Sequence, residues 1–165
     1  YFKVIEMKTA ELFALSCDLG ARLSGGTPEE AAALRRYGLS LGTAYQIYDD
    51  CLDLYGAESS AGKSLGTDLA SGKVTLPLIM GLDHSKPEDR EQLVRWLEDW
   101  QPEFFPKVRG LLEQNRALER SREVIGEFLN TSDEALSTLK PGPQVDALYA
   151  LSRFLARQTD LLAGS

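Results

Sequence analysis

Three aspartates lie on one side of a predicted helix, where they could bind a metal ion together. At about 100° per residue, Asp49, Asp50 and Asp53 project with Gly42 and Gln46 into one arc of about 100°. Carboxylates near the C-terminal end of a helix repel one another and oppose the helix dipole, so a cation should compensate them. Hard oxygen ligands suit Mg²⁺, which binds one or two carboxylates together with substrate phosphates and water. The spacing therefore suggests a metal-bridged diphosphate site.

The opposite side of the same helix is expected to pack against neighbouring elements. It carries Tyr37, Leu41, Tyr48 and Leu52. A simpler interpretation is that the aspartates form a solvated acidic surface, because acidic runs on helices usually do. An EF-hand calcium loop fits less well, since its ligands alternate in a loop with a central glycine and a terminal glutamate.

Three lysines could supply the positive charge that a diphosphate needs. Lys8 precedes Thr9, and Lys63 and Lys73 each follow a glycine, where the backbone can approach a ligand closely. A single surface lysine is by default only a solubilising charge. The combination of these lysines with the aspartates is what favours a diphosphate site.

The secondary structure around these residues is predicted to be helical. Apolar residues recur at the helical period of 3.6, and no segment alternates as a strand would. Thr27 to Glu30 reads as a capping box with proline at the first helical position. Pro77 is expected in the first turn of a short helix, or at a kink in it. Helices are predicted over residues 2–23, 28–55, 74–82, 89–100, 103–114, 117–139 and 144–162, with a loop at 56–72.

Composition limits the function classes. The chain has 165 residues, 25 acidic and 18 basic, and no basic stripe, which argues against nucleic acid as a partner. No apolar run approaches the ~20 residues of a membrane-spanning helix, so no integral membrane association is expected. Cys17 and Cys51 lie in helical stretches and are expected to be free, buried thiols, which predicts a cytoplasmic location.

Several motifs occur in a distinctive order along the chain. They are Gly42-x-x-x-Gln46-x-x-Asp49-Asp50-x-x-Asp53, Gly62-Lys63-Ser64-Leu65-Gly66-Thr67-Asp68 and Gly72-Lys73-Val74-Thr75-Leu76-Pro77-Leu78. In this order they resemble the second conserved region of the trans-isoprenyl diphosphate synthases, also called polyprenyl synthetases. Lys8-Thr9 falls where that family has its lysine-threonine motif, whereas Ser64 stands where proline is frequent.

The resemblance implies a fold and an activity. The fold is an all-α helical bundle, the C-terminal part of the isoprenoid synthase fold, with residues 1–165 as the C-terminal half of a single polyprenyl synthetase domain. The intact enzyme, expected to be a homodimer, would use Mg²⁺ to ionise an allylic diphosphate. It would then condense the cation with isopentenyl diphosphate to make a longer polyprenyl diphosphate in isoprenoid biosynthesis. No other Asp-Asp-x-x-Asp occurs here, so the family's first such motif is expected upstream of Tyr1 and this chain alone is expected to be inactive.

The resemblance also implies roles for individual residues. Thr9 and Gln46 would lie against the cationic carbon, and His84 is expected to be a surface histidine without a catalytic role. The implied metal ligands are Asp49, Asp50 and Asp53; the implied diphosphate ligands are Lys8, Lys63 and Lys73; the implied catalytic set is Lys8, Thr9, Gln46, Asp49 and Asp50.

Two other functions are compatible with parts of the sequence. A non-catalytic regulatory or scaffold subunit of a prenyl diphosphate synthase would explain a single aspartate-rich motif. A terpene cyclase of related fold would be expected to show Asn-Asp-x-x-Ser-x-x-x-Glu, and this pattern does not occur. If helices of the family fold lie outside this chain, the chain should expose apolar helix faces and self-associate.

Overall fold

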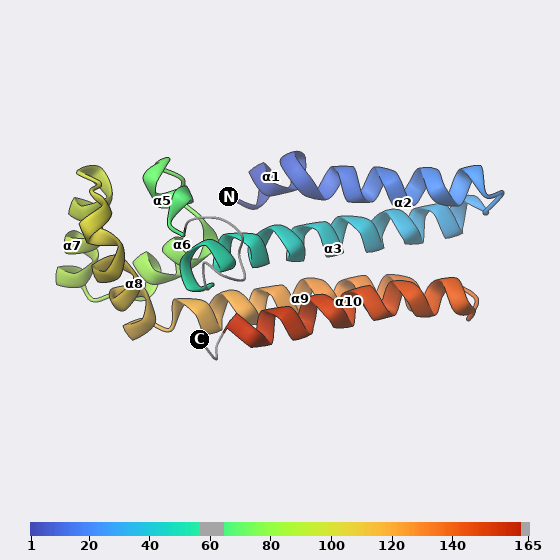
Figure 1. The fold of residues 1–165 in the computed structure, drawn as a ribbon. Helices are drawn as coiled ribbons and strands as arrows, with labels where there is room; N and C mark the ends of the chain where they lie inside the picture. The colour runs from blue at the N-terminus through green and yellow to red at the C-terminus, as the bar shows by residue number, and fades with distance from the viewer. Residues whose placement is uncertain (57–64, 163–165) are drawn as a thin grey trace. The chain divides into compact units, whose positions relative to one another are not determined.

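The structure, a computed structural model, describes residues 1–56 and 65–162. Within these two ranges the regular elements are helices and no strand occurs, which confirms the all-α prediction (Figure 1). None of the described helices is long and apolar enough to cross a lipid bilayer. The chain divides into two compact units. Unit 1 comprises Tyr1–Gln46 and Val124–Thr159, and unit 2 comprises Ile47–Glu123 and Asp160–Ser165.

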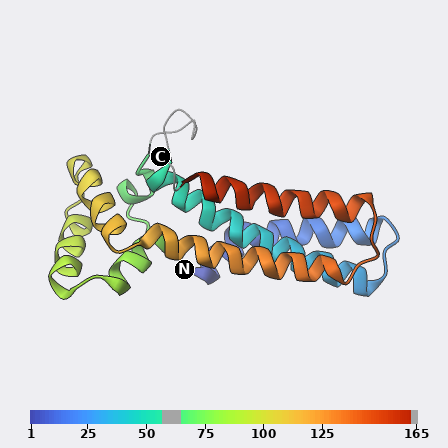
Figure 2. The same ribbon diagram turned by 90° about the horizontal axis from the view of Figure 1, so that it is seen from below.

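Unit 1 is built from long helices that run alongside one another (Figures 1 and 2). The chain enters through a short α-helix and a π-helical turn that continue into α2, which the sequence predicted as one regular helix. The elements that contribute to unit 1 are α1 (Phe2–Ile5), the π-helix η1 (Glu6–Ala10), α2 (Glu11–Leu23), α3 (Pro28–Tyr55), α9 (Ala117–Ser137) and α10 (Pro143–Leu161).

The start of α3 is fixed by the predicted capping box. The backbone N–H of Thr27 donates to Oε2 of Glu30 at 2.8 Å, and the backbone N–H of Glu30 donates to Oγ1 of Thr27 at 3.2 Å. These reciprocal bonds satisfy backbone donors that a helix start otherwise leaves unpaired. The helix then continues to Tyr55, where the sequence predicted its end.

Small residues allow α3 to approach the N-terminal segment closely. A Cβ atom on Gly42 would lie 2.8 Å from the Cα atom of Ala10 and 3.0 Å from the Cβ atom of Phe13. Gly38 faces the same segment, and a Cβ atom there would lie 2.6 Å from the carbonyl oxygen of Phe13. Gly38 and Gly42 therefore allow α3 to pack closely on this segment.

Unit 2 packs short helices against the C-terminal end of α3. Pro77 lies in the first turn of its helix, one of the two outcomes that the sequence allowed. The fully buried side chains include Leu78, Leu93, Val108 and Leu112. The short helix α5 falls inside the region predicted as a loop. The elements of unit 2 besides the ends of α3, α9 and α10 are α5 (Thr67–Ala70), α6 (Leu76–His84), α7 (Pro87–Glu98), the 3₁₀-helix η2 (Pro102–Phe104) and α8 (Phe105–Gln114).

Candidate functional site

The acidic end of α3 is enclosed by protein. Asp50 is 5% exposed and Asp53 is fully buried, while Asp49 is half-buried. Tyr48 and Leu52, on the side expected to pack, are only half-buried. Because buried carboxylates need compensation by hydrogen bonds or positive charge, this arrangement is unlike the solvated acidic surface of the simpler interpretation.

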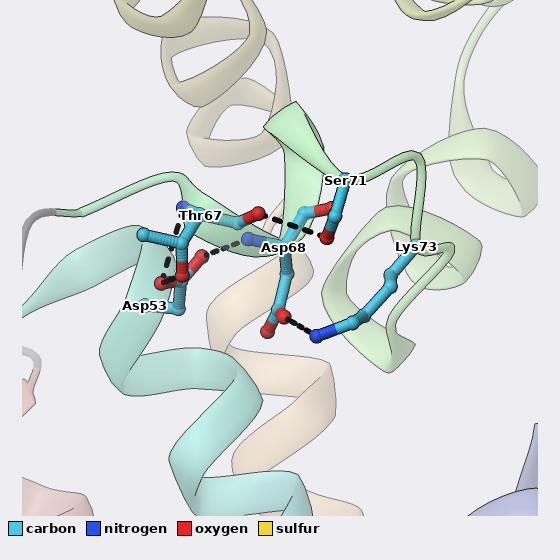
Figure 3. A network of polar contacts seen from close by, with 5 residues as sticks. All are labelled: Asp53, Thr67, Asp68, Ser71 and Lys73. Atoms are coloured by element: carbon cyan, nitrogen blue, oxygen red, sulfur yellow. Dashed lines mark hydrogen bonds and ion pairs between the residues drawn. The ribbon is translucent and has the colours of Figure 1, made fainter.

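Asp53 is held by a turn that follows it in the sequence (Figure 3). Its Oδ1 atom accepts hydrogen bonds from the backbone N–H of Thr67 at 3.3 Å and from the Thr67 hydroxyl at 2.7 Å. Its Oδ2 atom accepts a bond from the backbone N–H of Asp68 at 3.0 Å. The backbone N–H of Gly66 donates to the Asp53 carbonyl at 2.8 Å. Asp53 therefore anchors Gly66, Thr67 and Asp68 to the end of α3.

Gly66 is required by the geometry of this turn. Its φ angle of +73° lies in the left-handed region, which side chains other than glycine adopt at a cost. A Cβ atom at this position would also lie 2.7 Å from the ring of Phe105. The glycine that the sequence motif contains thus has a structural reason.

Lys73 is tied to the same turn. Its Nζ atom lies 2.6 Å from Oδ1 of Asp68, and its backbone N–H donates to the carbonyl oxygen of Asp68 at 2.9 Å. The hydrogen bond that Lys73 donates to Asp68 raises the pKa of Lys73, and the charges of Asp68, Asp50 and Asp53 add to this effect. The Lys73 side chain is still 57% exposed. One ammonium group therefore lies within the field of three carboxylates while remaining open to solvent.

Three of the predicted site residues, Lys8, Thr9 and Gln46, belong to unit 1. Lys8 and Thr9 lie in the π-helical turn η1, and the Thr9 hydroxyl donates to Oε1 of Gln46 at 2.7 Å. Gln46 is 7% exposed, whereas Lys8 is exposed. π-Helical turns occur frequently at functional sites. The structure thus brings Thr9 and Gln46 together, while Lys63 lies outside the described residues.

A metal ion at the acidic end of α3 would need ligands beyond the aspartates. In the part of the chain that the structure describes, no three histidine, cysteine, aspartate or glutamate side chains are grouped so as to hold a metal ion by themselves. The buried carboxylate of Asp53 is engaged by Thr67 and Asp68. The carboxylates of Asp49 and Asp50 fit Mg²⁺ by their chemistry, because this ion combines one or two carboxylates with phosphate and water oxygens. The assignment of all three aspartates as ligands stays a prediction.

Thr67 and Asp68 are the residues to which the sequence reasoning gave no role. The available signal was their position directly after Gly66 within a recognised motif.

His84 is exposed, as expected. It is the last residue of α6, and its Nδ1 atom lies 2.9 Å from the carbonyl oxygen of Met80. Both cysteines are free thiols, and Cys51 is buried as expected, but Cys17 is only half-buried.

Comparison with known proteins identifies the family. Residues 1–110 match the family model for polyprenyl synthetases. The chain belongs to the polyprenyl synthetase family. A short chain isoprenyl diphosphate synthase from Methanothermobacter thermautotrophicus is 34% identical over 155 residues, which cover 94% of this chain and 48% of that protein. The octaprenyl diphosphate synthase of Escherichia coli is 34% identical over 161 residues, which cover 96% of this chain and 49% of that protein.

Solved structures of polyprenyl synthetases share the fold. A polyprenyl synthase from Caulobacter crescentus, complexed with calcium and isoprenyl diphosphate, matches with a TM-score of 0.89 at 34% identity, covering 94% of this chain and 48% of that one. A geranylgeranyl pyrophosphate synthase from Corynebacterium glutamicum, complexed with isoprenyl diphosphate and magnesium, matches with a TM-score of 0.84 at 27% identity. The match covers 95% of this chain and 46% of that one. The all-α isoprenoid synthase fold is thereby confirmed. The chain spans about half the length of these relatives.

Proposed function

We propose that this chain carries the second aspartate-rich site of a trans-prenyltransferase. The enzyme condenses an allylic diphosphate with isopentenyl diphosphate to make a longer polyprenyl diphosphate in isoprenoid biosynthesis. One observation carries the proposal: the buried acidic end of α3 lies beside the exposed ammonium of Lys73. Carboxylates for a divalent cation and a lysine for an anion are what a metal-bound diphosphate requires.

The predicted residues other than Asp53 each have a defined task in this proposal. Asp49 and Asp50 hold Mg²⁺, and Lys8, Lys63 and Lys73 hold the diphosphate. Bound Mg²⁺ supplies electrostatic and Lewis-acid stabilisation of the charge that grows on the leaving pyrophosphate. Thr9 orients the amide of Gln46 by its hydrogen bond to Oε1, and both side chains lie against the allylic cation. The family's first aspartate-rich motif, which these 165 residues do not contain, completes the site.

The relatives support the choice of ligands. The Caulobacter crescentus structure contains calcium and isoprenyl diphosphate, and the Corynebacterium glutamicum structure contains magnesium and isoprenyl diphosphate. A divalent cation and an isoprenyl diphosphate are therefore the expected ligands of this family member, and Mg²⁺ is the cation that we propose. We also propose a cytoplasmic homodimer, with residues 1–165 as part of one polyprenyl synthetase domain.

A regulatory or scaffold subunit is the second candidate. The heptaprenyl diphosphate synthase component 2 of Bacillus subtilis is 33% identical over 158 residues, and its name describes a synthase with more than one component. A subunit of this kind would bind a partner synthase and change its activity without transferring a prenyl group itself. The retained aspartates and lysines favour the catalytic role, because a scaffold has no need for them.

The test uses the full-length gene product, an allylic diphosphate, labelled isopentenyl diphosphate and Mg²⁺. We expect chain elongation that stops when the metal is chelated. Asp49→Asn and Asp50→Asn should each lower kcat by about a hundredfold or more, because a charge-stabilising group at the reacting centre is lost. Asp83→Asn, which changes an exposed aspartate of α6, is the control and should leave kcat unchanged. No elongation by the full-length protein, together with stimulation of another synthase, would favour the scaffold.

A further inference from the structure

The hydrogen bonds of Asp53 differ from those expected of a metal ligand. A carboxylate oxygen offers two lone-pair sites, and both acceptor sites of Oδ1 are used by Thr67. Oδ2 accepts from the backbone of Asp68, and the Asp53 side chain is fully buried. The contacts of Asp53 that Figure 3 draws all go to the turn that begins at Gly66.

The same turn also restrains Lys73. The Asp68 carbonyl oxygen accepts hydrogen bonds from the backbone N–H of Lys73 at 2.9 Å and from the Ser71 hydroxyl at 3.0 Å. The Asp68 carboxylate holds the Lys73 ammonium at 2.6 Å. Asp68 therefore restrains Lys73 through both its main chain and its side chain, while Asp53 restrains the main chain of Asp68.

We infer that Asp53 is a positioning residue: its carboxylate fixes the turn at Thr67 and Asp68, and Asp68 holds the ammonium of Lys73 at the acidic end of α3. The ligand class is a diphosphate, and this part of the inference rests on the proposed function. A lysine side chain has four rotatable bonds, so holding it in place before the ligand arrives reduces the conformational entropy lost on binding. The ammonium has three N–H donors, and one bond to Asp68 leaves others for phosphate oxygens.

Three substitutions break this connection at different points. Asp53→Asn keeps one oxygen for Thr67 but turns an NH₂ group toward the backbone N–H of Asp68, so the turn loses a bond. Asp68→Asn removes the ion pair to Lys73 but keeps the backbone N–H that donates to Asp53. Thr67→Val removes only the hydroxyl bond of 2.7 Å, and Thr67→Ser retains it as the conservative rescue. If Asp53→Asn does not fold, Asp68→Asn and Thr67→Val still test the connection.

The first experiment measures the reactivity of Lys73 in the full-length protein. The protein is treated with an amine-acylating reagent, and modification of Lys73 is followed by mass spectrometry against the exposed Lys86 as an internal reference. Asp53→Asn and Asp68→Asn should raise the relative rate about two- to fivefold, the range expected when an ion pair this exposed is lost. Thr67→Val should raise it less, and Thr67→Ser should match the wild type. Wild-type reactivity in both Asp53→Asn and Thr67→Val would overturn the inference.

The second experiment separates positioning from metal binding. Binding of Mg²⁺ alone and of inorganic pyrophosphate with Mg²⁺ is measured calorimetrically for Asp49→Asn, Asp53→Asn and Asp68→Asn. We expect Asp49→Asn to lose the metal, while Asp53→Asn keeps it and binds pyrophosphate as weakly as Asp68→Asn. The double variant Asp53→Asn with Asp68→Asn should be no weaker than the single variants, because both act through Lys73. Metal loss by Asp53→Asn equal to that of Asp49→Asn would make Asp53 a direct ligand. Failure of the proposed function would appear differently: the wild type would bind no pyrophosphate, while Lys73 would still react faster in Asp53→Asn and Asp68→Asn than in the wild type.

Discussion

The hydroxyl of Thr9 donates a hydrogen bond of 2.7 Å to the amide oxygen of Gln46, 37 residues further along the chain. The bond joins the π-helical turn η1 to α3 inside unit 1. Because the threonine hydroxyl is the donor, the bond fixes which end of the Gln46 amide faces η1. The lysine-threonine motif thus has a structural task in addition to the role that the family resemblance implies.

Replacement of Thr9 by valine should weaken this connection. The variant keeps the shape of the side chain but leaves the Gln46 oxygen without this donor, which should lower the free energy of unfolding by about 0.5–1.5 kcal/mol. The coupling free energy between the two residues is measured by urea unfolding of four proteins: the wild type, Thr9→Val, Gln46→Leu and the double variant. Thr9→Ser, which keeps the hydroxyl, is the control. Additive effects of the two single changes would show that the bond contributes nothing.

Gly42 should tolerate no side chain. A Cβ atom there would lie 2.8 Å from the Cα atom of Ala10, and neither helix backbone can move easily. Gly42→Ala should therefore destabilise the protein by about 1–3 kcal/mol through overpacking. Gly126→Ala is the matched control, since Gly126 lies inside α9 with no atom within 4 Å of the added Cβ. The control substitution should raise the free energy of unfolding by about 0.5–1 kcal/mol, because alanine has a higher helix propensity than glycine. Equal effects of the two substitutions in a denaturant titration would contradict the packing argument.

The long helices could be predicted because their signals are local. The capping box at Thr27 and Glu30 and the proline at Pro28 are read within a few residues, and the structure confirms the start of α3 there. The buried positions of α2 were harder to predict. The helical period of the apolar residues does not show which face is covered. The buried residues are Ala14 and Ala21, because the face that packs on α3 is the one with small side chains.

Features that depend on distant contacts could not be predicted. Nothing in the sequence of Glu6–Ala10 marks a π-helical turn, which forms where this segment meets α3. The sequence also could not show which partner the Asp53 carboxylate has, because a metal ion and a pair of N–H groups satisfy it equally well. Its partner, Thr67, lies 14 residues away across a segment predicted as a loop.

The stability of the fold should depend on the protonation of Tyr37. Burial raises the pKa of Tyr37 from 10.0 to about 12, and its hydroxyl donates to the carbonyl oxygen of Leu148 at 3.0 Å. Above pH 10 the unfolded chain ionises this phenol while the folded state keeps it neutral. The contribution of Tyr37 to the free energy of unfolding is therefore complete below pH 10 and is lost as the pH rises toward 12.

Tyr37→Phe should therefore change the pH dependence of unfolding. Between pH 9 and 11 the free energy of unfolding of the wild type should fall by about 1.4 kcal/mol more than that of the variant. This is the difference expected when one ionisable group has a higher pKa in the folded state than in the unfolded chain. Urea midpoints at several pH values measure this difference. Tyr45→Phe, which changes a ring that is 45% exposed, is the control and should follow the wild type. Parallel pH profiles for the wild type and Tyr37→Phe would show that Tyr37 is not the group responsible.

The exposed leucines of α2 should make the 165-residue chain self-associate. Leu12, Leu15, Leu19 and Leu23 recur at three- and four-residue intervals, and their exposed fractions range from 45% to 85%. Such a spacing places them on one side of the helix, and a contiguous apolar surface of this kind is unfavourable in water. Sedimentation velocity should show the average mass rising with protein concentration. The double variant Leu12→Gln with Leu19→Gln should shift this rise to higher concentrations, because burial of each leucine side chain contributes about 1.5–3 kcal/mol. Glu127→Gln, an exposed position of α9 in the same unit, should leave it unchanged. A single monomeric boundary for the wild type at all concentrations would mean that the exposed leucines do not drive association.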